Sequence, residues 1–336
     1  MRARRMIRDR NGSRAASIPV SRGAMSGIFY RALFMAVVCL CPVQADMIIA
    51  GYTDAANDRF TKDAGFILAG HDLSGVGRTA GSRWATAISR NVIISASHYQ
   101  PSGTVSFYTS NDPALAPVTR TISSTMTLAI PGTDLFLGVL DQNLPNSITH
   151  YDFATTPLSG AETFLASAGP YQGLNAYSFG LSLFDVGSDP DRSVVNDQAV
   201  GRNLVSAYSE NVSFNGNTDN DALLFLQDSP GHANFVTHEA EFIAGDSGAP
   251  TFVEVGGDLL LLGTNAFTLS DDPVTFTYNG VNYTGNQAAT IQDFVSASAV
   301  PEPSALVTMS LVLVPLVTRR RRVFMALRHI GWMEII

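Results

Sequence analysis

The sequence predicts an all-β body of roughly 250 residues, and three observations support this class. Short β-branched and aromatic runs recur along the chain, separated by Gly, Asn, Asp and Pro. Only the stretch Ala288–Val295 shows a helical period. Hydrophobic residues make up 46% of the chain and charged residues only 15%, which is typical of a secreted β protein with long polar loops. We expect a pair of barrels or a sandwich.

The predicted strands are short, alternating or continuously apolar, and bounded by turn residues. They cover Phe66–Gly70, Ala85–Ile88, Asn91–Ser95, Thr104–Thr109, Val118–Leu128 and Leu135–Leu140 in the first half, and Thr163–Ala168, Asn203–Tyr208, Ala222–Leu226, Thr251–Val255, Leu259–Leu262 and Val274–Tyr278 in the second. The Gly- and Ser-rich stretch Gly75–Ser82 is expected to be a loop. The sequence has no internal repeat of fixed period.

The body is strongly acidic. Residues 46–300 contain 8 Lys and Arg against 26 Asp and Glu, a net charge of −18. This charge repels phosphate backbones, so no nucleic-acid partner is expected. Cys39 and Cys41 lie in an N-terminal apolar run, so a mature chain without that run has no disulfide and no thiolate metal site. The loops at Asp185–Asp191 and Asp219–Asp221 lack the full calcium-loop spacing, and no metal or cofactor is predicted.

A secretory signal peptide is predicted over residues 1–45. An Arg-rich segment precedes the apolar run Ala32–Cys41, and Val43-Gln44-Ala45 offers the small residues that a signal peptidase reads. Met25 is an alternative start, because the segment from Met25 to Ala45 is a compact signal by itself. The apolar run is too short to span a bilayer as an anchor. The mature chain is therefore expected to begin near Asp46.

The C-terminal end carries a second distinctive pattern. Val300-Pro301-Glu302-Pro303-Ser304 is followed by the apolar run Ala305–Val317 and the block Arg319–Arg322. About 14 helical residues cover ~21 Å, less than the ~30 Å of a hydrocarbon core. Because the run abuts an arginine block, it suits a short membrane segment anchored on its positive side. The alternative is a buried C-terminal helix.

The most informative stretch for chemistry is Gly245-Asp246-Ser247-Gly248-Ala249-Pro250. Glycines on both sides of a serine allow a tight turn that projects the hydroxyl and aims N–H groups at one point. A serine becomes a nucleophile when a base takes its proton and donors stabilise the oxyanion. The alternative interpretation is an ordinary turn capped by Asp and Ser.

Two upstream residues supply the missing parts of a nucleophilic site. His98 follows the apolar strand segment Asn91–Ser95, and Asp134 directly precedes the run Leu135–Leu140. An imidazole at a rigid strand end can act as base, and a partly desolvated carboxylate can orient it. A serine, a histidine and an aspartate acting together form a catalytic triad. The chain order His98, Asp134, Ser247 is one of the orders known for such triads.

These motifs resemble those of the trypsin/chymotrypsin-like serine proteases. Ser95-Ala96-Ser97-His98 is similar to the family's Thr-Ala-Ala-His, Asp134-Leu135-Phe136-Leu137 to its Asp-Ile-Ala-Leu, and the segment 245–250 to its Gly-Asp-Ser-Gly-Gly-Pro. The resemblance covers roughly residues 60–295. It implies a protease domain over residues 46–299 that folds as two six-stranded antiparallel β-barrels with the active site between them.

The resemblance also implies roles for single residues. Ser247 is expected to attack a carbonyl group of a protein or peptide substrate, with His98 as base and acid and Asp134 holding the imidazole. The N–H groups of Gly245 and Ser247 would form the oxyanion hole. By position, Glu241 would lie near the floor of the primary specificity pocket and favour basic side chains; the alternative is a solvated loop carboxylate.

Two features depart from the family's pattern. Tyr99 stands where the family usually has a half-cystine, so the loop after His98 has no disulfide. In many members a freed N-terminal isoleucine pairs with the residue that corresponds to Asp246. Ile48-Ile49-Ala50-Gly51 faintly resembles such a terminus, although it begins two residues after the predicted cleavage point.

The C-terminal pattern resembles the PEP-CTERM sorting signal of Gram-negative bacteria. Residues 300–322 match its Pro-Glu-Pro motif, apolar run and arginines, whereas the tail 323–336 extends beyond the usual end. The resemblance implies export to the cell envelope or extracellular surface, transient membrane contact through this segment, and processing by an exosortase-type enzyme after the signal peptidase has acted.

Three functions are consistent with these patterns. The first is an exported serine endopeptidase that uses His98, Asp134 and Ser247. The second is a catalytically inactive, protease-like surface or binding protein displayed through its tail. The third is an esterase with the same triad, because acyl transfer to esters needs the same parts.

Overall fold

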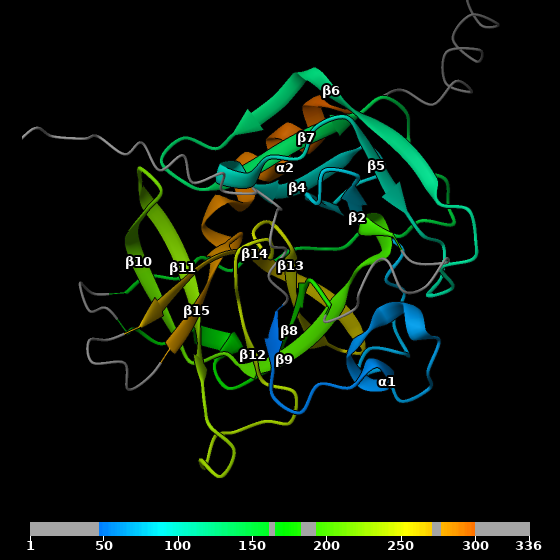
Figure 1. Cartoon of the computed structure of the whole chain (residues 1–336). Helices are drawn as coiled ribbons and strands as arrows, with labels where there is room; N and C mark the ends of the chain where they lie inside the picture. The colour runs from blue at the N-terminus through cyan, green and yellow to red at the C-terminus, as the bar shows by residue number, and fades with distance from the viewer. Residues whose placement is uncertain (1–46, 161–164, 183–192, 271–276, 300–336) are drawn as a thin grey trace, which may run out of the picture. The chain divides into compact units, whose positions relative to one another are not determined.

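The strands of the protein pair into a closed barrel, a larger sheet and a short two-stranded ladder (Figure 1). The computed structural model describes residues 47–160, 165–182, 193–270 and 277–299. The predicted signal peptide and the predicted sorting signal lie outside these residues. So does most of the predicted strand Val274–Tyr278 and the beginning of Thr163–Ala168.

The first half of the chain forms the barrel. Its strands are β2 (Val76–Thr79), β3 (Trp84–Ala87), β4 (Val92–Ala96), β5 (Thr104–Phe107), β6 (Val118–Ala129) and β7 (Leu135–Leu140). They close antiparallel in the order β2-β3-β4-β7-β6-β5. Every residue of β4 and β7 is buried, which explains why these strands appear in the sequence as continuous apolar runs rather than as alternating patterns.

The second half forms a seven-stranded sheet. Its strands are β8 (Asn175–Gly180), β9 (Ala199–Leu204), β10 (Ala207–Phe214), β11 (Asn217–Gln227), β13 (Pro250–Val255), β14 (Asp258–Ser270) and β15 (Thr277–Tyr283). They pair in the order β10-β11-β15-β14-β13-β8-β9. Apart from these strands, β1 (Ile48–Ile49) pairs with β12 (Ala240–Glu241).

Helical structure is limited. The α-helices of the described residues are α1 (Asp54–Asn57) and α2 (Ala288–Ala297), and the 3-10 turns are η1 (Arg59–Thr61), η2 (Ser97–Tyr99), η3 (Gly169–Tyr171), η4 (Val194–Asn196) and η5 (Gly285–Gln287). None of the helices in this part of the chain is long and apolar enough to cross a membrane. The all-β class with two antiparallel units is confirmed.

The second unit differs in detail from the expected six-stranded barrel. The predicted strand Asn203–Tyr208 is divided at Val205 and Ser206, between β9 and β10. The Val205 N–H donates to the Leu174 carbonyl, whereas the Ser206 N–H donates to the Leu224 carbonyl. The backbone thus changes its hydrogen-bonding partner between Val205 and Ser206. The single predicted strand is therefore divided between β9 and β10.

Two local predictions are wrong. The segment Phe66–Gly70 is a series of turns, although Phe66 and Leu68 are buried as in a strand; the preceding Asp63 carboxylate accepts the Gly65 N–H and starts a turn. The supposed loop Gly75–Ser82 contains β2. Glycine is required there, because a Cβ on Gly77 would lie 2.7 Å from the ring of Phe107.

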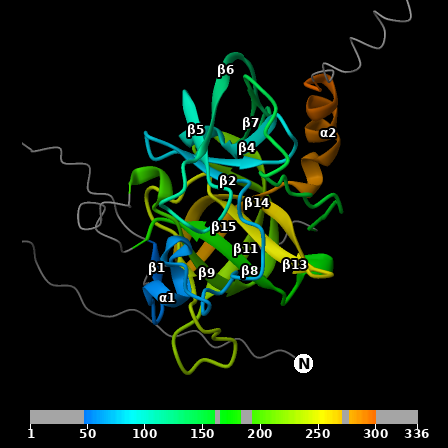
Figure 2. The ribbon, with the colours of Figure 1, turned by 90° about the vertical axis from the view of Figure 1, so that its right-hand side faces the viewer.

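One hydrophobic cluster joins the barrel to the sheet. It contains Trp84 and Leu137 from the barrel and Phe179 and Phe252 from the sheet. Helix α2 lies beside the barrel (Figure 2) and adds the fully buried Ile291 to the same cluster. The two β units therefore share a continuous core, which fixes the loops where they meet.

Candidate active site

His98 and Asp134 are brought together by the register of two neighbouring barrel strands. Strand β4 pairs with β7 so that Ala96 lies opposite Leu135. The chain beyond β4 and the chain before β7 therefore leave the barrel side by side. Beyond Ala96, the Ser97 N–H donates to the Asp134 carbonyl at 2.7 Å. The 3-10 turn η2 then presents His98 to the Asp134 side chain.

Both carboxylate oxygens of Asp134 face this turn. Oδ1 accepts the His98 backbone N–H at 2.7 Å, and Oδ2 lies 2.6 Å from His98 Nδ1. The Asp134 side chain is fully buried, whereas the imidazole is 15% exposed. A carboxylate only accepts hydrogen bonds, so the pairing assigns the proton to Nδ1 and leaves the Nε2 lone pair available as a base.

Two asparagines of the second sheet hold the aspartate from its other side. The Asn282 amide on β15 donates to Asp134 Oδ2 at 3.1 Å. The Asn220 side-chain oxygen on β11 accepts the Asp134 N–H at 2.7 Å. All three residues are almost fully buried. The orientation of the His98 ring thus depends on both β units, because a buried carboxylate fixed by several donors has little freedom to turn.

Ser247 lies on the loop between β12 and β13. Gly245 and Gly248 have φ values of +109° and +84°, a region that side-chain-bearing residues rarely adopt. The Asp246 N–H donates to the Ile243 carbonyl, and the Ala249 N–H returns to the Asp246 carbonyl. The glycines thus permit the tight turn that the sequence motif predicts, with Ser247 at its centre.

The far side of this loop rests against the barrel strand that leads to His98. A Cβ on Gly248 would lie 2.5 Å from Ser95 Oγ and 3.1 Å from the Ala96 nitrogen. The Gly248 N–H donates to the Asn265 carbonyl at 2.9 Å. Only glycine allows this close approach, which places the Ser247 loop directly on the end of β4.

Ser247 and His98 line one cavity of about 220 Å³. Its other walls are mostly apolar and aromatic. They are formed by Phe214, Phe242, Ile243, Ala244, Asn265, Ala266, Phe267 and Thr268. The Phe214 ring stands edge-on to the His98 ring, with centroids 5.1 Å apart, and packs on Phe267 at 5.3 Å. An apolar wall beside the imidazole reduces its contact with water.

The loop also offers unused donors beside the serine. In the part of the chain that the structure describes, the N–H groups of Gly245 and Ser247 have no acceptor, whereas those of Asp246, Gly248 and Ala249 are bonded within the fold. The Gly245 carbonyl accepts the Trp84 indole N–H at 3.0 Å. Two free N–H groups on a fixed turn are what an oxyanion site requires.

Asp246 anchors the loop from within. Its Oδ1 accepts the Leu181 N–H at 2.8 Å, and its Oδ2 accepts the Ile243 N–H at 2.9 Å. Burial raises the pKa of Asp246 to about 7, and these two N–H groups and the charge of Arg78 oppose the rise. Ionisation of this buried carboxyl therefore costs free energy, and the surrounding donors offset only part of it.

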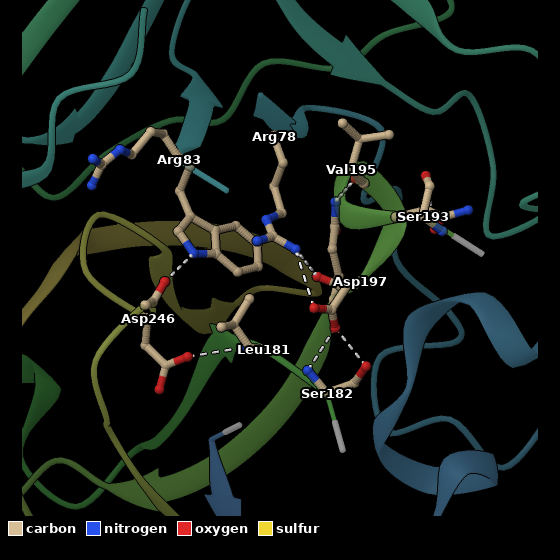
Figure 3. Close-up of polar contacts among 12 residues, drawn as sticks. Arg78, Arg83, Leu181, Ser182, Ser193, Val195, Asp197 and Asp246 are labelled. Atoms are coloured by element: carbon tan, nitrogen blue, oxygen red, sulfur yellow. Dashed lines mark hydrogen bonds and ion pairs between the residues drawn. The ribbon is translucent and has the colours of Figure 1, made fainter. Parts of the chain in front are cut away.

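Arg78 is a buried cation whose charge acts on this carboxyl, and Figure 3 shows its guanidinium beside Asp197. Its Nη1 donates to the Asp197 carbonyl and lies 3.5 Å from Asp197 Oδ2. Asp197 Oδ1 in turn accepts the N–H and hydroxyl of Ser182. Burial lowers the pKa of Arg78, and the charges of Asp197 and Asp246 raise it. A charged contact thus joins the barrel to the second unit behind the Ser247 loop.

One residue that the sequence places at the specificity pocket is not part of this arrangement. Glu241 does not line the cavity; it lies in β12, opposite Ile48 of β1. The next residue, Phe242, lines the cavity instead. Neighbouring residues in an extended chain point to opposite sides, so counting residues back from Ser247 is one position off. Ile48 and Ile49, which faintly resemble a freed N-terminus in the sequence, form strand β1, which pairs with β12.

Sequence reasoning missed Asn282, Phe214 and Arg78. Asn282 lies in a strand rich in polar residues, and Phe214 ends a strand whose sequence gives no sign of its partner His98. Arg78 lies in a stretch that the sequence favours as a loop. No local pattern in the sequence marks any of these three residues.

Comparison with protein-family models and with curated proteins gives no match. Among solved structures, a mutant of human heparin binding protein (CAP37) aligns with 69% of this chain and 95% of its own, at 15% identity and a TM-score of 0.42. The passenger domain of the plasmid encoded toxin, an autotransporter enterotoxin of enteroaggregative Escherichia coli, aligns with 66% of this chain at 14% identity and a TM-score of 0.38. This chain spans 22% of that passenger-domain chain. These similarities are too distant to assign a family.

Proposed function

We propose that the protein is an exported serine endopeptidase with the triad His98, Asp134 and Ser247. The observation that carries the proposal is the cavity shared by Ser247 and His98, with the imidazole paired to a buried carboxylate at 2.6 Å. This combination supplies a nucleophile, a base and an orienting group in one place.

In the proposed mechanism, His98 Nε2 takes the proton of the Ser247 hydroxyl as Oγ bonds to the scissile carbonyl carbon. The Gly245 and Ser247 N–H groups stabilise the negative oxygen that forms. The imidazolium, held by Asp134, then gives its proton to the leaving amine as the peptide C–N bond breaks. Water, deprotonated by His98, releases the acyl group and restores Ser247.

The cavity lining supports a preference for apolar side chains in the substrate. Phe214, Phe242, Phe267 and Ala266 are among its lining residues, and burying an apolar side chain against such residues is favourable. A basic side chain finds no carboxylate among the described lining residues, because Glu241 lies elsewhere. The expectation of a basic preference is therefore replaced by an apolar one.

The test is hydrolysis of internally quenched peptides by the exported chain. Three matched sets carry an apolar, a basic or an acidic residue before the scissile bond. We expect hydrolysis of the apolar set first, and a loss of about 10⁴-fold or more in Ser247→Ala. Folded wild-type protein that cleaves no peptide, or cleaves as slowly as Ser247→Ala, would contradict the proposal and favour the binding protein. Cleavage of matched esters alone would favour the esterase.

Export and sorting form part of the same proposal. The signal peptide over residues 1–45 and the PEP-CTERM signal over residues 300–322 rest on sequence patterns alone, as does the domain span 46–299. Terminal sequencing of the protein from the producing cell's envelope is expected to find an N-terminus near Asp46 and a C-terminus near the Pro-Glu-Pro motif. An intact C-terminal tail in the mature protein would contradict processing.

A further inference from the structure

The peptide between Gly245 and Asp246 is held from both sides. Its carbonyl accepts the Trp84 indole N–H at 3.0 Å, and its N–H donates to the Ile243 carbonyl at 3.1 Å. Gly245 has no side chain to restrain it, and its φ of +109° is available to few other residues. Without the Trp84 bond, only the hydrogen bond to the Ile243 carbonyl would hold this peptide plane.

The direction of the Gly245 carbonyl matters for chemistry. Trp84 is fully buried in the barrel and is not among the residues that line the cavity. The bond to Trp84 therefore keeps the carbonyl oxygen turned away from the cavity. This peptide lies between the two peptides that carry the Gly245 and Ser247 N–H groups, so a rotation of it would turn those donors away from their present directions.

Trp84 is itself fixed by its neighbours. Arg78 is its register partner on β2, and the guanidinium carbon lies 4.6 Å from the centre of the indole ring. On the other unit, Phe179 of β8 meets the indole edge-on at 6.5 Å. The indole thus lies between a cation and an aromatic edge, both favourable contacts for its ring.

Arg78 is fixed in turn by the second unit, through its contacts with Asp197 (Figure 3). Among the described residues, its Nε and Nη2 have no hydrogen-bond partner. The stacked Trp84 ring and the carboxyl groups of Asp197 and Asp246 therefore provide most of what offsets the cost of burying the Arg78 charge. An arginine buried with so few hydrogen bonds is costly, which argues for a role beyond filling space.

We propose that Trp84, held in place by Arg78, is a positioning residue for the oxyanion site: its indole N–H fixes the Gly245 carbonyl and so aims the loop's N–H groups at the substrate. The inference rests on the proposed function and adds two residues that the triad motifs do not include. It also means that two residues of the barrel help to set the geometry of a loop that belongs to the sheet.

The test is the rate of phosphonylation by a fluorophosphonate, separated into kinact and KI, on the full exported chain. Trp84→Phe removes the N–H donor and keeps a ring. We expect kinact to fall about 10- to 100-fold, somewhat less than the loss of an oxyanion donor itself. KI should stay within about twofold, because the cavity walls are unchanged.

The matched control is Tyr151→Phe. The Tyr151 hydroxyl also donates to a backbone carbonyl at 3.0 Å, that of Asp72, and Tyr151 is also buried. It lines a different cavity from that of Ser247. This variant should lose a similar amount of thermal stability but keep its kinact. A Trp84→Phe protein with the kinact of Tyr151→Phe, or with a change in KI alone, would overturn the proposal.

A second pair of variants covers the case in which Trp84→Phe does not fold. Arg78→Met removes the cation above the indole, and Arg78→Lys keeps a charge there. We expect kinact to fall about 3- to 30-fold in the first and to recover in part in the second. Equal kinact in both and in the wild type would overturn the inference. Wild-type protein that is labelled at no serine would instead overturn the proposed function itself.

Discussion

The barrel and the sheet contribute to the candidate site in different ways. The barrel presents His98 and Asp134 at the ends of two hydrogen-bonded strands, so their proximity follows from the β4–β7 register. The sheet presents Ser247 on a loop whose position depends on packing against the barrel and on Asp246. The proximity of His98 and Asp134 is therefore set by strand pairing, with Asn282 of the sheet holding the Asp134 side chain in addition. The position of Ser247 is set by contacts between distant segments.

This difference predicts different sensitivities. Changes to the His98–Asp134 pair should alter the chemistry and leave the geometry intact, since the backbone register holds both residues. Changes to the supports of the Ser247 loop should alter the geometry first, and the chemistry through it. Three variants test this contrast, in order of decreasing effect.

Asp134→Asn should have the largest effect. The amide would present a donor to His98 Nδ1, which favours the wrong imidazole tautomer, and we expect kcat to fall about 10⁴-fold. Because β4 and β7 stay paired, the melting temperature should change by only a few degrees. Kinetics on peptide substrates and calorimetry measure both quantities. Activity within about tenfold of wild type would show that the pair has no role in the reaction.

Gly248→Ala should have an intermediate effect. The new Cβ would meet Ser95 Oγ at 2.5 Å and the backbone of Ala96 at 3.1 Å, at a φ of +84°. We expect a loss of about 2–4 kcal/mol in unfolding free energy, and a fall in kcat of about tenfold or more as the loop is pushed off the barrel. Urea unfolding and peptide hydrolysis are the measurements.

Two controls separate crowding from backbone strain. Gly257 has a φ of +95°, and a Cβ added there would have nothing within 4 Å, so Gly257→Ala should cost about 1–2 kcal/mol and leave kcat unchanged. Ser95 Oγ is buried without a partner among the described residues, so adding Ser95→Ala to Gly248→Ala should restore part of the loss. No recovery in the double variant would mean that the loop does not rest on β4.

Asp246→Asn should have the smallest effect on kcat of the three. It should lower stability at every pH, because the amide NH2 cannot accept one of the two N–H groups that the carboxylate oxygens accept, and it should also change the pH dependence of stability. The pKa of Asp246 is raised to about 7 by burial, above its ordinary value, so folding takes up a proton. Its contribution to stability is present below about pH 4 and is lost as the pH rises through 7. Arg78 and Asp197 are the charged groups that face it.

The measurement is urea unfolding of both proteins between pH 4.5 and 7.5. We expect the wild-type unfolding free energy to fall relative to that of Asp246→Asn, by at most about 1.4 kcal/mol per pH unit. The other titrating groups are common to both proteins and cancel in the difference. Parallel curves would show that Asp246 does not take up a proton on folding.

The sequence predicted what is local in this site. His98 and Asp134 flank apolar runs that predicted strands, and the glycines around Ser247 predicted a tight turn. It did not reveal Arg78 with Asp197, which are 119 positions apart, or Asn282 against Asp134, which are 148 apart. Such pairs depend on how two β units pack, and no local pattern of residues encodes that.

The same limit explains the errors at single positions. Counting from Ser247 places Glu241 in the pocket, but a shift of one residue in an extended segment turns a side chain to the other face. The strand β2 is hidden in the sequence because its glycine, next to the Phe107 ring, carries the signal of a loop. Packing constraints that act across the barrel override the local preference in both cases.

The most direct test of the account is to label the exported chain with a fluorophosphonate and find the modified residue by mass spectrometry. We predict one phosphonyl group per chain on Ser247, formed rapidly in the wild type and slowly in His98→Ala. An adduct at another residue, equal rates in the two proteins, or no adduct on folded wild-type protein would contradict a single active centre built from the barrel and the sheet.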